Sequence, residues 1–271
     1  MLKSNSDTVR RFINRKKRNE GKSKPEEVVE AVRPKYIFSS ITHAGKVREN
    51  NEDCLIVSEN RFHAENRDIS SIFAAVADGL GGMKDGEKAS YMAVTRAFAY
   101  FIENASFLLD GVPYDKVLVK ALNRANISIR ESNGKKEQDD HMATTLTLVA
   151  VSGDRGYFVH SGDCTIMRVN SRIESINRSH RMPKTNQIYS CLGITEEVEV
   201  DTGEFKISSG DTILMCSDGL TDMVTSGEIK SIVSEFRNDP EKVCISLVEA
   251  ALNKGGRDNI SIIDIYCTGN P

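Results

Sequence analysis

Two segments of this chain share one construction, a run of mostly apolar residues that ends in Asp-Gly-Leu. The first run ends at residues 78–80 and the second at residues 218–220. A short apolar run predicts a buried strand, and the Asp-Gly pair that follows predicts a turn. An ionised carboxylate at the rim of an apolar sheet costs several kcal/mol unless another group compensates it. A lone Asp-Gly pair indicates only a turn, but two runs of this form indicate carboxylates that need a partner.

Two more acidic segments stand before predicted strands. Residues 48–53 read Arg-Glu-Asn-Asn-Glu-Asp, and residues 255–259 read Gly-Gly-Arg-Asp-Asn. Several acids directed at one point repel one another unless a cation lies between them. Hard divalent ions such as Mg²⁺ and Mn²⁺ prefer oxygen ligands, and a glycine after the aspartate lets a backbone carbonyl approach the ion. The four segments together predict a metal site.

The pattern of predicted elements favours a layered α+β domain. Strands are predicted at residues 36–42, 53–58, 71–78, 144–151, 156–160, 166–169, 198–207, 211–217 and 260–266. Helical periodicity predicts a helix at residues 114–129. Composition predicts a second helix at residues 87–103, and a third is predicted at residues 241–253, where Gly255 and Gly256 supply a stop. Many strands with a few separate long helices favour this class over a βαβ repeat.

The N-terminal residues differ in composition from the rest. The first 24 residues hold nine Lys or Arg against two acids. Such a segment buries too little apolar surface to offset its ordering entropy. We therefore expect residues 1–33 to form a basic, mobile arm and residues 34–271 to form one globular domain. The arm is interpreted either as a solvated tail or as a docking segment for an acidic partner.

Charge and apolar patterning exclude several classes of protein. The formal net charge is only −3, so no strong field favours binding to nucleic acid or to an acidic membrane. The longest apolar runs, at residues 72–77 and 145–151, are too short to cross a bilayer. The polar N-terminus lacks the apolar core of a signal peptide, so we expect a cytoplasmic location. The six cysteines include no C-x-x-C pair and are interpreted as buried, reduced thiols.

Six short motifs carry a resemblance to a known family. They are R-x-x-x-E-D, D-G-x-G-G, A-T-T, S-G-D, C-S-D-G-L and G-G-x-D-N, at residues 48–53, 78–82, 143–145, 161–163, 216–220 and 255–259. In this order they resemble the metal-dependent protein phosphatases of type 2C, over residues 39–266. Each motif alone is a weak signal, but six in family order are specific. The D-G-L-G-G form and the compact domain resemble the bacterial branch.

The resemblance implies a fold and a set of metal ligands. The fold would be a central β-sandwich of two antiparallel sheets flanked by α-helices, with two Mn²⁺ or Mg²⁺ ions in a cleft at one end. Asp78 matches the residue that bridges both ions, and the Gly79 carbonyl would bind one of them. Asp218 and Asp258 match the remaining protein ligands of the other ion. Glu52 matches an acid that serves the second ion directly or through water.

The resemblance also implies a reaction, with Arg48 and Asp53 as its candidate catalytic residues. Arg48 matches the arginine that holds substrate phosphate, a task that suits the bidentate geometry of a guanidinium. Water activated between the two ions would hydrolyse phosphoserine or phosphothreonine, so no cysteine nucleophile is needed. Indeed, none of the six cysteines stands in a C-x₅-R loop. The expected partners are phosphorylated protein substrates and a cognate Ser/Thr kinase.

One departure from the family pattern concerns the general acid. Many eukaryotic relatives have a histidine at the position of Leu80, proposed as the donor of the leaving-group proton. Its absence leaves that donor unassigned. His43 and His180 are possible substitutes, but a structural role is the simpler interpretation of each.

A second departure concerns a third metal ion. Asp163 matches an acid that binds this weaker ion in bacterial relatives, but Ser179 stands where an aspartate is usual. Only eleven residues separate His180 from Leu192, where relatives carry a longer flap. We expect an open site with weak or absent binding of the third ion. Replacing Asp163 with alanine should then barely alter metal dependence.

Two alternative functions stay open at this point. A pseudophosphatase would use the same fold as a binding or regulatory module, and it predicts missing metal ligands. A nuclease or another metal hydrolase would need basic and aromatic residues around the acidic segments, which the sequence does not place there. Activity on a phosphopeptide but not on an oligonucleotide would separate these alternatives from a protein phosphatase.

Overall fold

This computed structural model describes residues 36–64, 67–81, 83–104, 112–134, 137–183, 185 and 187–269. The predicted basic arm at residues 1–33 lies outside the described residues. Within the described part, no helix has the length and apolar character that a bilayer span requires.

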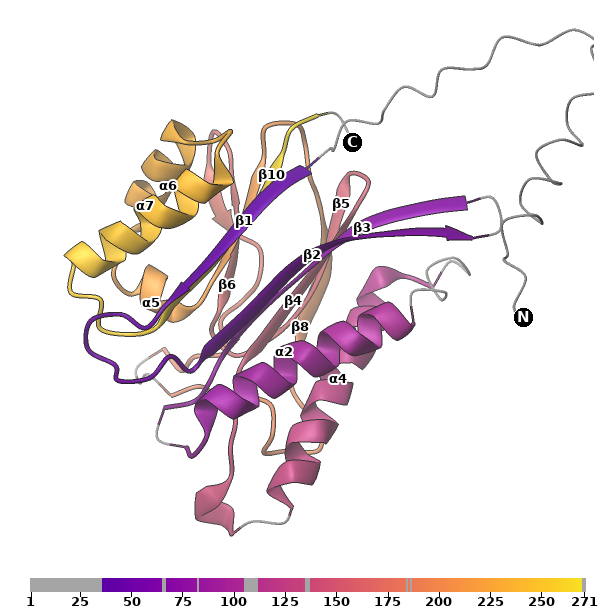
Figure 1. Cartoon of the computed structure of the whole chain (residues 1–271), viewed down its shortest axis with the longest axis vertical. Helices are drawn as coiled ribbons and strands as arrows, with labels where there is room; N and C mark the ends of the chain where they lie inside the picture. Colours follow the sequence, from indigo (N-terminus) through magenta and orange to yellow (C-terminus); the bar gives the residue numbers. More distant parts are fainter. Residues whose placement is uncertain are drawn as a thin grey trace, which may run out of the picture. The chain divides into compact units, whose positions relative to one another are not determined.

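Two five-stranded antiparallel sheets form the centre of the domain (Figure 1). The first sheet has the order β1 (Tyr36–His43), β10 (Ile260–Cys267), β9 (Thr212–Cys216), β6 (Thr165–Val169) and β7 (Ile173–Ser175). The second has the order β2 (Asp53–Ala64), β3 (Arg67–Asp78), β4 (Leu146–Ser152), β5 (Arg155–Ser161) and β8 (Asp201–Lys206). Every neighbouring pair is antiparallel.

Helices cover the outer face of each sheet (Figure 1). The second sheet is covered by α2 (Gly86–Glu103) and α4 (Tyr114–Asn133). The first is covered by α5 (Asp218–Thr221), α6 (Ser226–Glu235) and α7 (Pro240–Asn253). A short 3₁₀ helix, η1 (Gln138–Asp140), follows α4. The predicted α+β sandwich flanked by helices is therefore confirmed.

Alternation along the central strands fills three apolar layers. On β3, Phe73 packs toward the helices and against Phe101 of α2, whereas Val76 packs between the two sheets. On β10, Ile262 packs toward α7 and Ile263 packs between the sheets. Successive side chains of a strand point to opposite faces. A strand covered on both faces must therefore be apolar at nearly every position, which explains the continuous apolar runs in the sequence.

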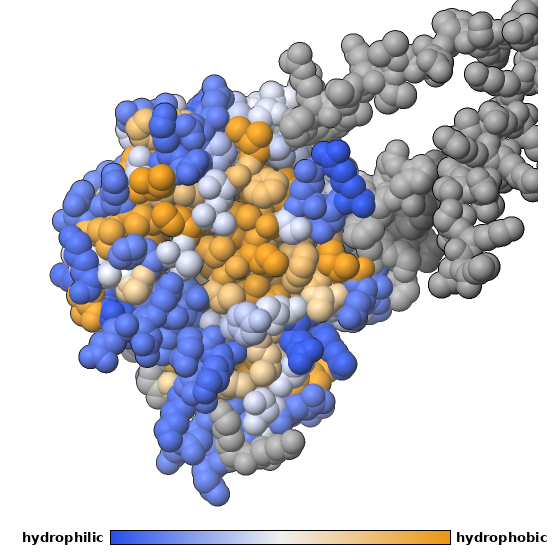
Figure 2. Space-filling model, in the orientation of Figure 1, coloured by the Kyte–Doolittle hydropathy of each residue, from blue (hydrophilic) through white to orange (hydrophobic). Residues whose placement is uncertain are grey.

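The space between the two sheets is open to solvent at one edge. Figure 2 shows apolar residues gathered in the middle of the face on which β1 and β2 run. Each of these two strands is an edge strand of its sheet. Side chains such as Phe38 and Leu55 pack against the inter-sheet core while they stay partly exposed.

Four elements, β2, β7, α5 and α6, differ from the sequence expectation or were absent from it. β7 has only three residues and α5 is a single turn of helix, so neither is long enough to show a period. α6 begins with a capping box in which Thr225 and Glu228 bond to each other's backbone N–H groups. β2 extends beyond the expected end at residue 58, because polar residues there pair with β3.

Candidate metal centre

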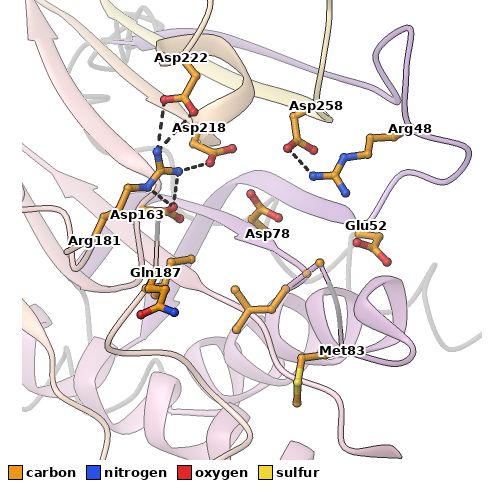
Figure 3. Close-up of a pocket in the computed structure, with 14 residues that line it drawn as sticks. Arg48, Glu52, Asp78, Met83, Asp163, Arg181, Gln187, Asp218, Asp222 and Asp258 are labelled. Carbon is orange, nitrogen blue, oxygen red and sulfur yellow. Dashed lines mark hydrogen bonds and ion pairs between the residues drawn. The ribbon is translucent and has the colours of Figure 1, made fainter. Parts of the chain in front are cut away.

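A cavity of about 620 Å³ lies at one end of the sandwich (Figure 3). Both sheets contribute, because the predicted acidic residues stand at strand ends or in the loops next to them. The lining residues are Arg48, Glu52, Asp78, Gly79, Leu80, Gly81, Met83, Asp163, Arg181, Gln187, Ile188, Asp218, Asp222 and Asp258. The fold therefore brings all six predicted metal ligands and Arg48 to one cavity.

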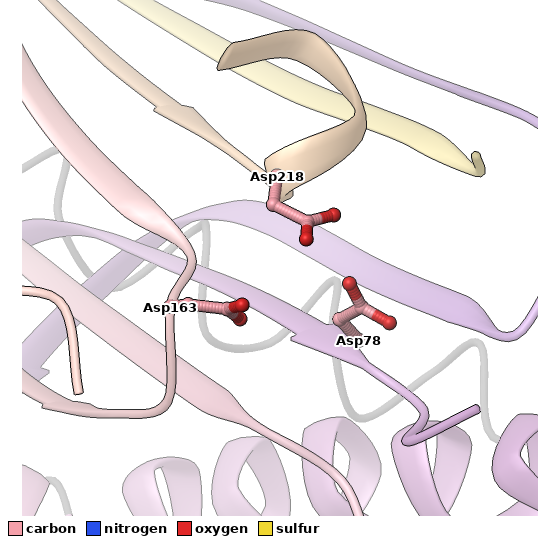
Figure 4. A group of neighbouring side chains, drawn as sticks. All are labelled: Asp78, Asp163 and Asp218. Atoms are coloured by element: carbon pink, nitrogen blue, oxygen red, sulfur yellow. The ribbon is translucent and has the colours of Figure 1, made fainter. Parts of the chain in front are cut away.

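Three of these carboxylates form the tightest group (Figure 4). Asp78, Asp163 and Asp218 each offer one oxygen, and these oxygens lie within 4.8 Å of one another. Asp258 and Glu52 line the same cavity but do not belong to that group. The donor set consists of oxygen atoms alone, which is the set that Mg²⁺ and Mn²⁺ prefer.

The A-T-T motif fixes the backbone of Asp78. The Asp78 amide donates to Thr145 Oγ1 at 2.9 Å, and Thr144 Oγ1 donates to the Asp78 carbonyl at 2.7 Å. The Thr145 amide also donates to that carbonyl at 2.9 Å. Both threonines are completely buried. The motif therefore holds the end of β3 in one position relative to the cavity.

Asp53 lies behind the cavity and does not line it. It pairs directly with Asp78 in the register of β2 and β3 and is only 8% exposed. Its Oδ2 accepts a hydrogen bond of 2.7 Å from Ser217 Oγ, and Ser217 Oγ accepts from the Ser261 amide at 3.0 Å. This chain of bonds connects the two sheets directly beneath the predicted metal ligands.

Asn259 joins the loops that carry the outer ligands. Its side-chain amide donates to the carbonyls of Ala44 and Asn50, each at 2.9 Å. Its side-chain oxygen accepts from the Glu52 amide at 2.8 Å. The asparagine of the G-G-x-D-N motif thereby ties the loop before β2 to the loop that contains Asp258.

The glycines of the two Asp-Gly-Leu turns are required by close backbone approach. A Cβ on Gly79 would lie 2.5 Å from the backbone carbonyl group of Gly86, at the start of α2. A Cβ on Gly219 would clash with the backbone carbonyl oxygen of Asn259. Tight packing of the backbone is thus a second reason for these glycines, besides the approach of a carbonyl to an ion.

Several carboxylate oxygens of the centre are buried without a protein partner. In the described part of the chain, Oδ1 of Asp53, Asp163 and Asp218 has no hydrogen-bond donor. Burial raises the pKa of Asp218 to about 7, and the charge of Asp163 adds to this rise. Burial also raises the pKa of Asp78 well above its usual value, with further contributions from Asp53 and Asp218. Buried carboxylate oxygens without a donor, and repulsion between the carboxylates, are the features expected of a cation-binding site before the cations bind.

Two arginines stand on opposite sides of the carboxylates (Figure 3). Arg48 Nη2 donates to Asp258 Oδ2 at 2.7 Å, and 46% of the Arg48 side chain is exposed. Arg181 contacts Asp163, Asp218 and Asp222. The exposed guanidinium belongs at the mouth of the site, whereas Arg181 lies among the acids.

Sequence reasoning did not single out Arg181 or Asp222. Asp222 stands four residues after Asp218, about one helical turn away. Residues at this spacing lie on the same face of a helix, so the spacing could have indicated that Asp222 lies near the site. Arg181 follows directly after His180, at the start of the shortened segment, but no local pattern marks it as part of the site.

Neither histidine considered as a general acid lines the cavity. His180 is buried, and its Nδ1 lies 3.3 Å from the Gly162 amide. His43 Nδ1 accepts from the Gly45 amide at 2.8 Å. Both contacts are with backbone groups of loops, so the structural interpretation accounts for both residues. Leu80 does line the cavity.

Comparison with known proteins assigns the chain to a family. The family model of protein phosphatase 2C matches residues 56–252. The serine/threonine phosphatase stp of Listeria monocytogenes serotype 4b is 31% identical over 241 residues, covering 82% of this chain and 92% of the relative.

Solved structures agree in fold. The serine/threonine phosphatase of S. agalactiae superposes with a TM-score of 0.70 and 26% identity, covering 85% of this chain and 99% of that chain. The catalytic domain of the phosphatase PstP in complex with two manganese ions superposes with a TM-score of 0.67 and 25% identity. The match covers 86% of this chain and 99% of that chain. With its two-sheet sandwich and its acidic centre, this chain belongs to the protein phosphatase 2C family of metal-dependent serine/threonine phosphatases.

Proposed function

We propose that this protein hydrolyses phosphoserine and phosphothreonine in proteins with a water molecule activated between two Mn²⁺ or Mg²⁺ ions. The observation that carries the proposal is the convergence of Asp78, Asp163 and Asp218, whose oxygens lie within 4.8 Å of one another. These acids are largely buried, and burial is the largest cause that raises their pKa values. Neighbouring carboxylates add to the rise, whereas Arg181 opposes it at Asp163 and Asp218. Divalent cations would remove that repulsion and stabilise the ionised forms.

The residues present fit two such ions. Asp78, the Gly79 carbonyl, Asp218, Asp258 and Glu52 would hold them, since all five line one cavity and offer oxygen ligands. When bound, the ions supply a water of lowered pKa and the positive charge that neutralises phosphate oxygens.

Arg48 would bind the phosphate group of the substrate. Its guanidinium is oriented by Asp258 and remains 46% exposed, so N–H groups are left to bind phosphate oxygens. For Asp53 we propose a positioning role, because it lies behind Asp78 in the neighbouring strand and accepts a hydrogen bond from Ser217. A protein Ser/Thr kinase would supply the substrates, since phosphoserine and phosphothreonine arise by phosphoryl transfer to hydroxyl groups.

The first experiment measures phosphate release from a phosphothreonine peptide. The wild type should be inactive in EDTA and active after Mn²⁺ is added in excess. Asp218→Asn removes one anionic ligand from the centre and should lower turnover at least about 100-fold, since a metal ion contributes several kcal/mol to catalysis. Glu249→Gln, which neutralises an exposed acid of α7, serves as the matched control and should keep wild-type turnover.

Three outcomes would contradict the proposal. Turnover that persists in EDTA would exclude a metal-activated water. A folded wild type that releases no phosphate with any divalent ion would instead favour a binding module of the same fold. An oligonucleotide and a small phosphate ester serve as competing substrates, because faster hydrolysis of either would reassign the substrate class.

A further inference from the structure

Arg181 makes a set of contacts that the proposed reaction does not account for. Its Nε and Nη2 donate to Asp163 Oδ2 at 3.1 and 2.7 Å, and Nη2 also donates to Asp218 Oδ2. Its Nη1 lies 3.3 Å from Asp222 Oδ2. Only 22% of the side chain is exposed, and Figure 3 shows the guanidinium between the three acids. The single positive charge of Arg181 therefore forms ion pairs with three carboxylates.

The backbone holds Arg181 in this position from both sides. It forms an isolated antiparallel bridge with Ile188. On its N-terminal side, the His180 amide donates to the Gly162 carbonyl at 2.7 Å, next to Asp163. On its C-terminal side, the Met182 amide donates to the Gln187 carbonyl at 2.9 Å. These backbone hydrogen bonds hold Arg181 where its side chain reaches into the acidic centre.

The guanidinium uses only one side of each buried carboxylate. Arg181 bonds to Oδ2 of both Asp163 and Asp218, whereas Oδ1 of each is buried and has no hydrogen-bond partner in the described part of the chain. Figure 4 shows the carboxylates of Asp163, Asp218 and Asp78 directed into one space. Asp218 can therefore bond to Arg181 through one oxygen and still offer the other to a cation beside Asp78.

We propose that Arg181 is a built-in cation that occupies the Asp163 side of the centre, so that the protein binds two divalent ions and excludes a third. This proposal rests on the proposed function, since it assumes a metal centre at Asp78 and Asp218. A guanidinium cannot lose its proton under ordinary conditions. A divalent ion on Asp163 would stand within a few ångströms of this fixed positive charge, and the repulsion between the two is strong in a partly buried site. Arg181 also holds Asp218 in one orientation and is therefore a positioning residue.

The test counts the Mn²⁺ ions bound per chain by equilibrium dialysis, with free Mn²⁺ measured by electron paramagnetic resonance. The full-length wild type should bind two ions at saturation. Arg181→Gln removes the charge and should bind a third, weaker ion. The double variant Arg181→Gln, Asp163→Asn should bind two Mn²⁺ ions per chain again. Arg181→Lys, which keeps a positive charge, should also bind two.

Matched controls keep the result interpretable. Arg155→Gln removes an arginine that forms an exposed ion pair with Glu204, and this variant should still bind two Mn²⁺ ions per chain. Thermal unfolding of the metal-free proteins establishes that each variant is folded. Three ions on the wild type, or two ions on a folded Arg181→Gln protein, would overturn the proposal for Arg181. No ion on the wild type would overturn the metal centre itself, so the two failures are distinct.

Discussion

Asp264 is a buried carboxylate outside the metal centre. It stands in the middle of β10 and is completely buried, and neither of its oxygens has a hydrogen-bond partner in the described residues. It lies on the same face of the strand as Ile262, which packs in the layer beneath α7. Burial raises the pKa of Asp264 well above its usual value. Because its pKa is raised, Asp264 is protonated and neutral in the folded protein at low pH.

Asp264 therefore makes stability depend on pH. Its folded-state pKa lies above the unfolded value of about 4, so the folded protein binds this proton more tightly than the unfolded chain does. Its contribution to stability is complete below about pH 4 and is lost as pH rises toward the folded-state pKa. We expect the free energy of unfolding of the metal-free wild type to fall more steeply from pH 5 to pH 8 than that of Asp264→Asn.

Urea denaturation at several pH values measures this difference. Any packing or hydrogen-bonding defect of the new amide is the same at every pH, so only the difference between the two slopes reports on Asp264. The acids of the metal centre contribute equally to both proteins and cancel. Parallel curves for the wild type and Asp264→Asn would show that this carboxyl does not titrate differently in the folded state.

At the scale of elements, α5 is a single helical turn whose position depends on close packing at Gly219. Gly219 packs directly on the backbone of Asn259, and Asn259 in turn ties the loops that carry Glu52 and Asp258. The helix begins at Asp218, so its first turn sets the direction of that ligand. Close backbone contact, rather than helix propensity, fixes this element.

Gly219→Ala and Gly227→Ala should therefore have opposite effects. The added methyl group at 219 clashes with a backbone carbonyl oxygen and should destabilise the protein by about 1–3 kcal/mol. At 227, in α6, a Cβ meets no atom within 4 Å, and alanine should stabilise the helix by up to about 1 kcal/mol. Urea denaturation of both variants checks this, and equal shifts in one direction would contradict the packing argument.

At the scale of the whole molecule, the proposed metal centre joins the two sheets. Asp78 and Glu52 stand next to strands of the second sheet, whereas Asp218 and Asp258 stand next to strands of the first. Ions held by both pairs would bind the folded protein and not the unfolded chain, in which these residues lie far apart. Metal binding and the association of the sheets are therefore coupled.

We expect Mn²⁺ to raise the temperature of unfolding. One ion at a concentration of 100 times its dissociation constant adds about 2.7 kcal/mol, which for a domain of this size corresponds to about 5–10 °C. Asp218→Asn should lose most of this shift, and Glu249→Gln should retain it. Differential scanning calorimetry over a range of Mn²⁺ concentrations measures this shift. A midpoint temperature of unfolding that does not depend on Mn²⁺ would argue against ligands drawn from both sheets.

Local chemistry in the sequence determined much of this protein. The apolar runs predicted the central strands because a strand covered on both faces must be apolar throughout. The acidic segments next to predicted strands indicated a metal site, because converging carboxylates need a cation. The order of the motifs indicated the family, and the resemblance implied Asp78, Asp218 and Asp258 as ligands. The longest helices, α2, α4 and α7, were predicted from the sequence, and α4 showed the clearest helical periodicity, whereas α5 was too short to show one.

Only the tertiary structure decided how the side chains of the centre are arranged. Asp53 stands next to Glu52 in the sequence, yet it lies behind the cavity because it follows the strand register with Asp78. Arg181 meets Asp218 across 37 residues of chain, and Ser217 meets Asp53 across 164. Such contacts depend on how two sheets and their loops pack together. No local pattern encodes them, because each partner alone is an ordinary polar residue.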